Sequence, residues 1–167
     1  MLLKSIKSNK SKSNSIKSFP LKYLPKSLTK KDKQKQLQML LKSKRLYKQH
    51  KYYTRKKVKL SYKNKKSSHI INARKIYNIK SIIPNKELVK KTGCKLSALN
   101  EIVKKGEGAY YSSGSRPNQT PQSWGLARLA SALTGGKAAI IDYDIIKKGC
   151  NPKKKAFILA NKIKLNK

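Results

Sequence analysis

A surplus of positive charge is the feature that most limits how this chain can fold. Its 167 residues include 43 lysines and arginines and only 6 aspartates and glutamates, so the formal net charge is +37. A charge of this size repels itself in an isolated compact protein, but a polyanionic partner offsets it and releases condensed counterions on binding. This excess of basic over acidic residues therefore predicts a polyanionic partner. Nucleic acid, an anionic membrane surface and an acidic protein are the candidates, and nucleic acid is the commonest match.

Lysine supplies most of this charge, since the chain has 38 lysines and 5 arginines. An A+T-rich gene would raise the lysine, asparagine, isoleucine and tyrosine content without selection for binding, but it does not explain why so few acidic residues are present. A lysine ammonium is a flexible point charge, whereas the planar arginine fork can pair with a guanine edge. We therefore expect contacts with phosphates, which carry no sequence information, and hence non-specific binding.

Several classes of protein find no support in the sequence. The longest apolar runs have about four residues, against the ~18 that cross a bilayer, and the first residues lack the apolar stretch of a secretory signal. Cys94 and Cys150 are expected to be reduced thiols of an intracellular protein. With only His50 and His69 besides, they lack the spacing of a zinc site. No glycine-rich run ends in Gly-Lys-Ser/Thr, so no nucleotide P-loop is expected.

Catalysis needs a base or nucleophile in a structured site, and the sequence offers few candidates. The pair Asp142 and Asp144 could hold a metal, but two carboxylates without a third nearby are a weak signal. Asp142 is expected instead to cap a helix and to pair with Lys147 or Lys148. We therefore expect no enzyme activity, no metal and no cofactor.

Positive charge is unevenly distributed along the chain. Residues 1–85 carry 26 basic residues and 1 acidic residue, residues 86–148 carry 11 and 5, and residues 149–167 carry 6 and 0. We expect a disordered basic tail over 1–18, a basic extended or helical region over 19–67, a small globular domain over 68–150 and a second disordered basic tail over 151–167. The fold is expected to be α+β, mainly helical with short strands.

The region 19–67 holds the main candidates for phosphate contact. Thr29 can cap a helix over 30–48, with Asp32 in its first turn, where a carboxylate suits the helix dipole. Val58, Leu60 and Tyr62 alternate with polar residues, which predicts a short strand with one basic face. The tyrosines among these cations could stack on bases, or they could only complete a small core. The expected nucleic-acid contacts here are Lys30, Lys31, Lys42, Lys44, Arg45, Lys48, Arg55, Lys56 and Lys57.

Residues 85–106 have the order of a helix-turn-helix unit. Asn85 can cap a first helix that ends at Gly93, and Ser97 can cap a second. In such a unit Ser97 and Asn100 would contact DNA, and Asn100 could pair with adenine. Any helical hairpin with a glycine in its turn has the same pattern, so a helix pair used only for packing stays open as the alternative.

Elsewhere in the 68–150 region the sequence predicts a helix, a loop and a strand. Ser68 is expected to cap a short helix, and the polar segment 106–120 is expected to be a surface loop. Thr120 followed by proline is a strong helix start, and Trp124 is expected to anchor the core from that helix. The apolar run 138–141 is expected to be a buried strand.

Two blocks of the chain carry distinctive motifs. The first, residues 19–77, contains FPLKYLPKSLTKKDKQKQ, YYTRKK and KKSSHIINARKIY; the second, residues 84–150, contains KKTGCKLSALNEIVKKGEGAYYSSGSRPNQTPQSWGLARLASALTGGKAA. Both blocks resemble an uncharacterised family of small lysine-rich basic proteins encoded by large nucleocytoplasmic DNA viruses. The resemblance implies a viral origin and a place in the virion or the viral factory. It supplies no activity and no functional residues.

Three functions agree with these patterns. The first is non-specific binding of nucleic acid, DNA more than RNA, with charge neutralisation of the kind that genome packaging requires. The second is a minor capsid or cement protein whose basic tails thread between other virion proteins. The third is a helix-turn-helix regulator. The sequence leaves the oligomeric state open.

Overall fold

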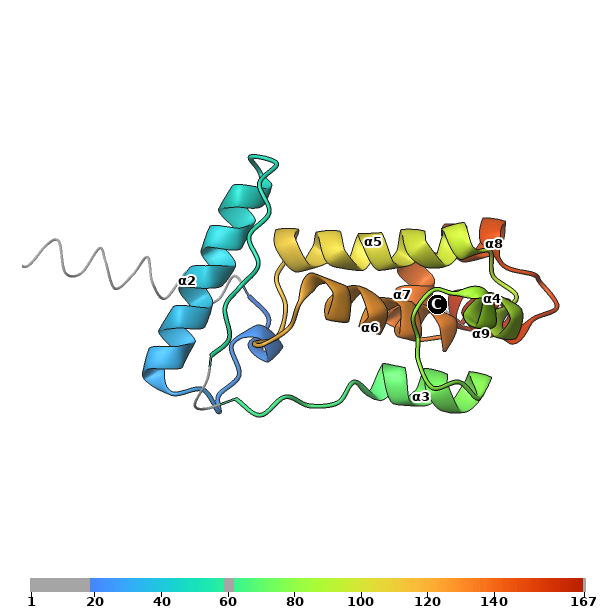
Figure 1. Ribbon diagram of the computed structural model, residues 1–167, viewed down its shortest axis with the longest axis horizontal. Helices are drawn as coiled ribbons and strands as arrows, with labels where there is room; N and C mark the ends of the chain where they lie inside the picture. The colour runs from blue at the N-terminus through green and yellow to red at the C-terminus, as the bar shows by residue number, and fades with distance from the viewer. Residues whose placement is uncertain (1–18, 59–61, 167) are drawn as a thin grey trace, which may run out of the picture. The chain divides into compact units, whose positions relative to one another are not determined.

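The computed structural model describes residues 19–58 and 62–166, and its regular elements are helical (Figure 1). These residues form eight α-helices and one short 3₁₀-helix, and no β-strand occurs among them. The expectation of an α+β fold with short strands is therefore wrong. The disordered tail expected over 1–18 lies outside the described residues. The described chain divides into two compact units.

The first, which we call the N-terminal unit, contains the described residues up to Asn64 together with Tyr111–Gln119. Its elements are the 3₁₀-helix η1 (Leu21–Tyr23) and helix α2 (Lys30–Tyr47). As the sequence predicted, Thr29 starts α2: its hydroxyl oxygen accepts a hydrogen bond from the Asp32 backbone N–H at 3.2 Å. The buried apolar residues of this unit are Phe19, Tyr23, Leu24, Leu28, Leu37, Met39, Leu40 and Val58.

Val58 shows why the strand expected over 58–62 does not form. Asn118 Oδ1 accepts from the Val58 backbone N–H at 2.8 Å, and Asn118 Nδ2 donates to the Val58 carbonyl at 3.2 Å. One amide side chain thus satisfies both backbone groups that a neighbouring strand would otherwise pair. Val58 and Tyr62 are in no strand, and Leu60 lies outside the described residues.

The second, the C-terminal unit, contains Lys65–Tyr110 and the described residues from Thr120 onward. Its helices are α3 (Ser68–Tyr77), α4 (Lys86–Thr92), α5 (Leu96–Ser112, whose last two residues belong to the N-terminal unit), α6 (Pro121–Leu133), α7 (Lys137–Ile141), α8 (Tyr143–Gly149) and α9 (Lys155–Leu165). Leu99, Leu129, Leu133 and Ile146 are fully buried in one core to which all seven helices contribute. The core therefore does not stop at the end of the expected 68–150 domain.

Helices α5 and α6 run side by side in opposite directions (Figure 1), and glycines let them approach closely. A Cβ added at Gly106 would lie 2.6 Å from Gly125 Cα, and one added at Gly125 would lie 2.7 Å from the Val103 carbonyl oxygen. Any side chain at either position would meet backbone, which cannot yield as a flexible side chain can. The two glycines are therefore a requirement of this helix pair.

Three segments are helical where the sequence predicted otherwise. The run 138–141, expected as a strand, forms α7, because a short apolar run alone does not distinguish a buried strand from a buried helix. Residues 151–167, expected to be a disordered tail, contain α9, whose Ala156 and Ala160 lie one helical turn apart and are fully buried. The first part of the expected loop 106–120 extends α5 to Ser112.

Two further predictions in this unit need correction. The hydroxyl that caps α3 belongs to Ser67 and not to Ser68. Trp124 is only half-buried, so it does not anchor the core as expected. By contrast, Thr120 caps α6 with Pro121 at the first helical position, and Asn85 and Gly93 bound α4, as predicted.

Candidate nucleic-acid interface

Helix α2 has a buried face and, opposite to it, an exposed cationic face. Its buried residues include Gln36, Leu40 and Ser43. On the opposite side Lys31, Lys35, Lys42 and Arg45 are all exposed, and their spacing of four, seven and three residues places them within about 80° of the helix circumference. We call these four residues the α2 stripe. With a rise of about 1.5 Å per residue it extends over about 21 Å.

The surroundings of the α2 stripe are almost free of negative charge. Residues 19–58 contain 14 lysines and arginines, of which 12 are exposed, and Asp32 is the one acidic residue in this range. Asp32 is only 9% exposed, so it contributes little to the surface. The exposed cations include eight of the nine contacts predicted for this region: Lys30, Lys31, Lys42, Lys44, Arg45, Lys48, Lys56 and Lys57.

Arg55 is the exception, because it is 7% exposed and lies inside the N-terminal unit. Its Nη1 donates to Ser43 Oγ at 2.9 Å and its Nη2 to Ser115 Oγ at 2.8 Å. The Ser43 hydroxyl in turn donates to the Tyr111 carbonyl at 3.1 Å. Arg55 therefore ties α2 to the 111–119 segment and is not placed to contact a phosphate, contrary to the sequence-based prediction.

Aromatic rings support several of the exposed cations. Lys42 Nζ lies 4.6 Å from the centroid of the Tyr53 ring, and Lys44 Nζ lies 5.8 Å from that of Phe19. The Tyr52 ring is 69% exposed and lies edge-on to Tyr111, with 5.1 Å between ring centroids. An exposed, laterally supported ring among cations is able to stack on a base or sugar.

The helix-turn-helix order predicted for 85–106 is present, as α4, a turn of three residues, and α5. Ser97 and Asn100 are both exposed, although Ser97 lies within α5, which begins at Leu96, and so does not cap it. Ala98 is buried, and a Cβ added at Gly149 would lie 2.4 Å from its Cβ. The end of α8 thus covers one side of the first turn of α5, where a recognition helix would enter a groove.

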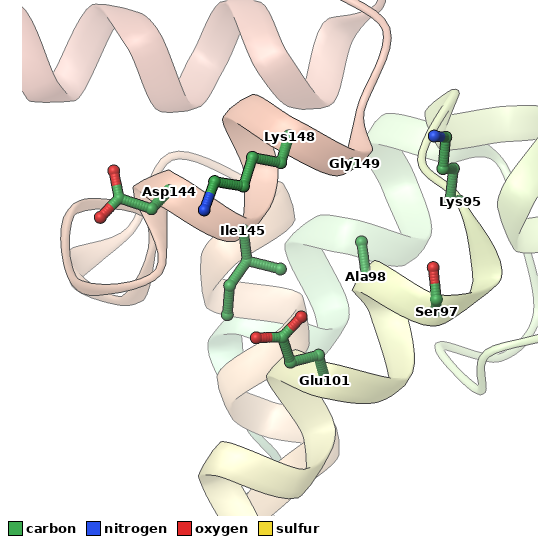
Figure 2. A pocket seen from close by; sticks show the side chains of 8 residues that line it. All are labelled: Lys95, Ser97, Ala98, Glu101, Asp144, Ile145, Lys148 and Gly149. Atoms are coloured by element: carbon green, nitrogen blue, oxygen red, sulfur yellow. The ribbon is translucent and has the colours of Figure 1, made fainter.

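A cleft of about 370 Å³ lies between α8 and the start of α5 (Figure 2). Glu101 and Asp144 line it together with Lys95, Lys148 and the neutral residues Ser97, Ala98, Ile145 and Gly149. The charges of two carboxylates and two ammonium groups cancel, so the cleft attracts a phosphate group less than lysines without such neighbours do. The cleft therefore adds no argument for sequence-specific recognition.

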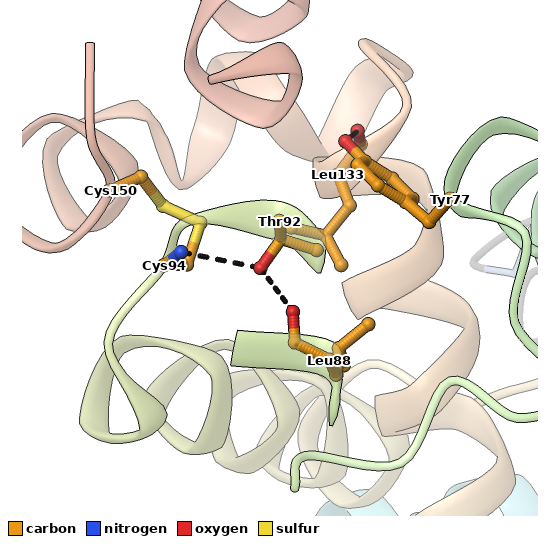
Figure 3. Close-up of a disulfide and its surroundings, with 6 residues drawn as sticks. All are labelled: Tyr77, Leu88, Thr92, Cys94, Leu133 and Cys150. Carbon is orange, nitrogen blue, oxygen red and sulfur yellow. Dashed lines mark hydrogen bonds between the residues drawn. A yellow bond between two sulfur atoms is a disulfide. The ribbon is translucent and has the colours of Figure 1, made fainter. Parts of the chain in front are cut away.

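A disulfide joins Cys94, in the turn between α4 and α5, to Cys150, directly after α8 (Figure 3). The expectation of two reduced thiols is therefore wrong. Thr92 supports the turn: its Oγ donates to the Leu88 carbonyl at 2.7 Å and accepts from the Cys94 backbone N–H at 3.3 Å. The two cysteines are 56 residues apart in the chain, so local sequence patterns gave no sign of the pairing.

Asp142 has a different role from the expected helix cap. Its side chain is fully buried, and both carboxylate oxygens accept from Arg128, from Nε at 2.7 Å and from Nη2 at 2.8 Å. Lys105 Nζ lies 2.9 Å from the same carboxylate, so the partners are Lys105 and Arg128 and not Lys147 or Lys148. Asp142 is thus committed to ion pairs that join α5 and α6 to the start of α8.

Burial raises the pKa of two tyrosines. The Tyr77 hydroxyl donates to the Leu133 carbonyl at 2.5 Å, and burial raises the pKa of Tyr77 well above its usual range. Burial also raises the pKa of Tyr23, and the nearby positive charges of Arg55 and Arg116 only partly oppose this. Both phenols are neutral near pH 7 and add no charge to the surface.

The described residues contain neither a membrane-spanning helix nor a cluster of metal ligands. None of their helices is both long enough and apolar enough to cross a bilayer. Nowhere in the described ranges do three or more His, Cys, Asp or Glu side chains gather in a way that could hold a metal ion.

A family of unknown function, DUF5824, matches residues 20–149. The chain belongs to this family. The DUF5824 match confirms the expectation of an uncharacterised family and covers both the α2 stripe and the turn that carries Cys94. Cys150 and α9 lie beyond the matched segment. No curated protein and no solved structure matches the chain.

Within the DUF5824 segment, sequence reasoning missed one residue of the candidate interface, Lys35, and did not distinguish another, Tyr52, from its neighbours. Lys35 belongs to the α2 stripe, and its Nζ also donates to the Lys57 carbonyl at 3.3 Å. Its spacing from Lys31 and Lys42 would have placed it on the stripe once the helix was predicted. Tyr52 is one of the tyrosines that, from the sequence, could stack on bases, and its exposure and its ring contacts with Tyr47 and Tyr111 distinguish it only in the folded protein.

Proposed function

We propose that this protein binds nucleic acid, DNA more than RNA, without sequence preference, and that the α2 stripe is the main phosphate-contacting surface. The observation that carries the proposal is the exposure of Lys31, Lys35, Lys42 and Arg45 along one side of α2, within a segment whose one carboxylate is buried. Among the described residues of its own unit, such a surface meets little negative charge. A polyanion supplies that charge and releases counterions as it binds.

The chemistry of the α2 stripe favours the nucleic-acid backbone over base edges. Three of its four residues are lysines, whose ammonium groups neutralise phosphates but do not form the fork that recognises guanine. A length of about 21 Å corresponds to about six base pairs along a duplex axis, at a rise of about 3.4 Å each. Tyr52 adds an exposed ring that can stack on any base, which is again independent of sequence.

The first prediction concerns a variant of the α2 stripe in which Lys31, Lys35, Lys42 and Arg45 are replaced with glutamine. Affinity for a 30-base-pair duplex should fall, and the slope of log K against log salt should become shallower by about 0.9 for each phosphate that the variant no longer neutralises. Fluorescence anisotropy at five salt concentrations measures both quantities. The loss should be equal for duplexes of unrelated sequence, because phosphates are the same in each.

A matched control loses the same four charges elsewhere. Lys75, Lys80, Lys137 and Lys162 are exposed residues of the C-terminal unit, and replacing them with glutamine should change affinity and slope much less. If the two variants bind equally well, total charge and not the α2 stripe controls binding, and the assignment of the stripe is wrong. If the unmodified protein binds no nucleic acid at low salt, the proposed function itself is wrong.

We further propose that the nucleic acid is the genome of a large DNA virus and that the protein neutralises it in the virion core. The viral resemblance of blocks 19–77 and 84–150 supports this, as does the abundance of lysine and tyrosine that an A+T-rich genome would encode. The disulfide agrees with an oxidising setting, since such bonds persist in secreted proteins and virions and are rare in the cytosol.

The virion proposal predicts where the protein is found after particles are taken apart. Cores stripped of their shell by mild detergent should retain it, and nuclease treatment should then release it, because the nucleic acid is what holds it there. Immunoblotting of each fraction makes the measurement. Release together with the shell proteins would instead favour a minor capsid or cement protein.

A further inference from the structure

The disulfide gathers lysines from two distant segments onto one part of the C-terminal unit. Seven lysines, and no acidic residue, lie within four residues of Cys94 or Cys150 in the chain. They are Lys90, Lys91, Lys95, Lys147, Lys148, Lys153 and Lys154, and all seven are exposed. We call them the disulfide patch. The charge counts along the sequence did not indicate this patch, because residues 86–148 as a whole have nearly half as many acidic as basic residues.

Backbone contacts keep the two segments of the patch together. The Lys95 N–H donates to the Gly149 carbonyl at 2.7 Å, and the Asn151 N–H donates to the Gly93 carbonyl at 2.9 Å, on either side of the disulfide. The stem of Lys154 lies against Gly93, where an added Cβ would come within 2.4 Å of its Cγ. Lys95 and Lys148 line the same cleft (Figure 2).

No ion pair within the described part of the chain neutralises the lysines of the patch. Among the described residues, the ion pairs found in the C-terminal unit join Lys105 and Arg128 to Asp142, and none involves the seven lysines. Glu101 and Asp144 border the patch at the cleft, on the side of Lys95 and Lys148. Their negative charge disfavours the binding of a small anion inside the cleft. The patch lysines that do not line the cleft face solvent.

We propose that the disulfide patch is a second nucleic-acid-binding surface, which contacts the sugar-phosphate backbone independently of the α2 stripe. The choice of nucleic acid as the polyanion rests on the proposed function. Ammonium groups distributed over two chain segments suit an extended row of phosphates better than one compact anion. An anionic membrane fits less well, because Leu96, at 44%, is the one large apolar residue within the two segments that is substantially exposed, too little for insertion into lipid.

The test uses the full chain with four exposed patch lysines that do not line the cleft, Lys90, Lys91, Lys147 and Lys153, replaced with glutamine. Binding to a 30-base-pair duplex and to a 30-nucleotide single strand is measured at several salt concentrations. We expect a weaker affinity for both. For each phosphate that the variant no longer neutralises, the salt slope should become shallower by about 0.9 on the duplex and by about 0.7 on the single strand. Replacing the same four lysines with arginine should retain the affinity and slope of the unmodified protein, because the charge is kept.

The variant lacking Lys75, Lys80, Lys137 and Lys162 serves again as the control of equal charge. If the patch variant binds like this control while the α2 stripe variant is weakened, the patch proposal is wrong and the proposed function stands. If the unmodified protein binds neither nucleic acid, both are wrong. If the patch variant keeps its affinity for nucleic acid but no longer binds phosphatidylserine vesicles, the patch is a membrane surface and the proposal is overturned.

Discussion

Replacing Asp142 with alanine should lower the free energy of unfolding of the C-terminal unit by about 3 kcal/mol, because removal of one member of a buried ion pair leaves its partners uncompensated. The Asp142 side chain is fully buried and accepts from Arg128 and Lys105. The side chains of Arg128 and Lys105 are 18% and 44% exposed, so water still reaches them. This places the expected loss at the low end of the ~3–5 kcal/mol typical of buried pairs.

Chemical denaturation followed by Trp124 fluorescence measures this loss, since Trp124 is the single tryptophan and belongs to the C-terminal unit. Asp144 offers a close control: it is an exposed carboxylate two residues away, and its replacement with alanine should change the stability by no more than about 0.5 kcal/mol. If the two substitutions lower the stability equally, the Asp142 ion pairs do not stabilise the unit, and the effect is only that of removing one negative charge.

The elements that could be predicted from the sequence are those whose signals lie within a few residues. Thr29, Asn85 and Thr120 each accept a hydrogen bond from a backbone N–H three residues later, and Gly93 has the left-handed conformation at the end of α4. Such caps depend on local geometry, so the starts of α2, α4 and α6 were correct before any tertiary contact was known.

The errors concern residues whose role depends on distant partners. Asp142 looked like a helix cap because its partners Lys105 and Arg128 are 37 and 14 residues away. The α9 segment looked like a basic tail because the two small alanines that it buries carry little hydrophobic signal in a lysine-rich background. Local sequence patterns do not show which residues pair over such distances along the chain.

The surface position of the cations in 19–58 could be predicted more easily than the fold, for a physical reason. A lysine is costly to bury, so nearly every lysine in 19–58 had to be at the surface whatever the fold. Arg55 fails as a contact because a planar guanidinium can satisfy its donors inside a protein, as it does with Ser43 and Ser115. The order of the cations along one side of α2 needed only the correct prediction of that helix.

Replacing both Cys94 and Cys150 with serine should lower the free energy of unfolding by about 4 kcal/mol, a larger loss than for Asp142. The disulfide closes a loop of 56 residues, and a cross-link of this span removes about 14 cal/mol/K of entropy from the unfolded chain. Denaturation followed by Trp124 fluorescence, with and without dithiothreitol, measures the effect. Reduction should destabilise the unmodified protein to the level of the variant and leave the variant unchanged.

The same variant separates the two surfaces, because only one of them depends on the disulfide. Without the cross-link, the Lys95–Gly149 and Asn151–Gly93 backbone hydrogen bonds still connect the two lysine segments, and each contributes only about 1 kcal/mol. Under conditions in which the variant is still folded, its affinity for nucleic acid should fall toward that of the disulfide-patch variant, whereas the contribution of the α2 stripe should stay the same. The stability of the same variant gives the contrary outcome. If the variant is as stable as the unmodified protein under oxidising conditions, the disulfide does not stabilise the fold, and the core and these two hydrogen bonds alone determine the position of the turn.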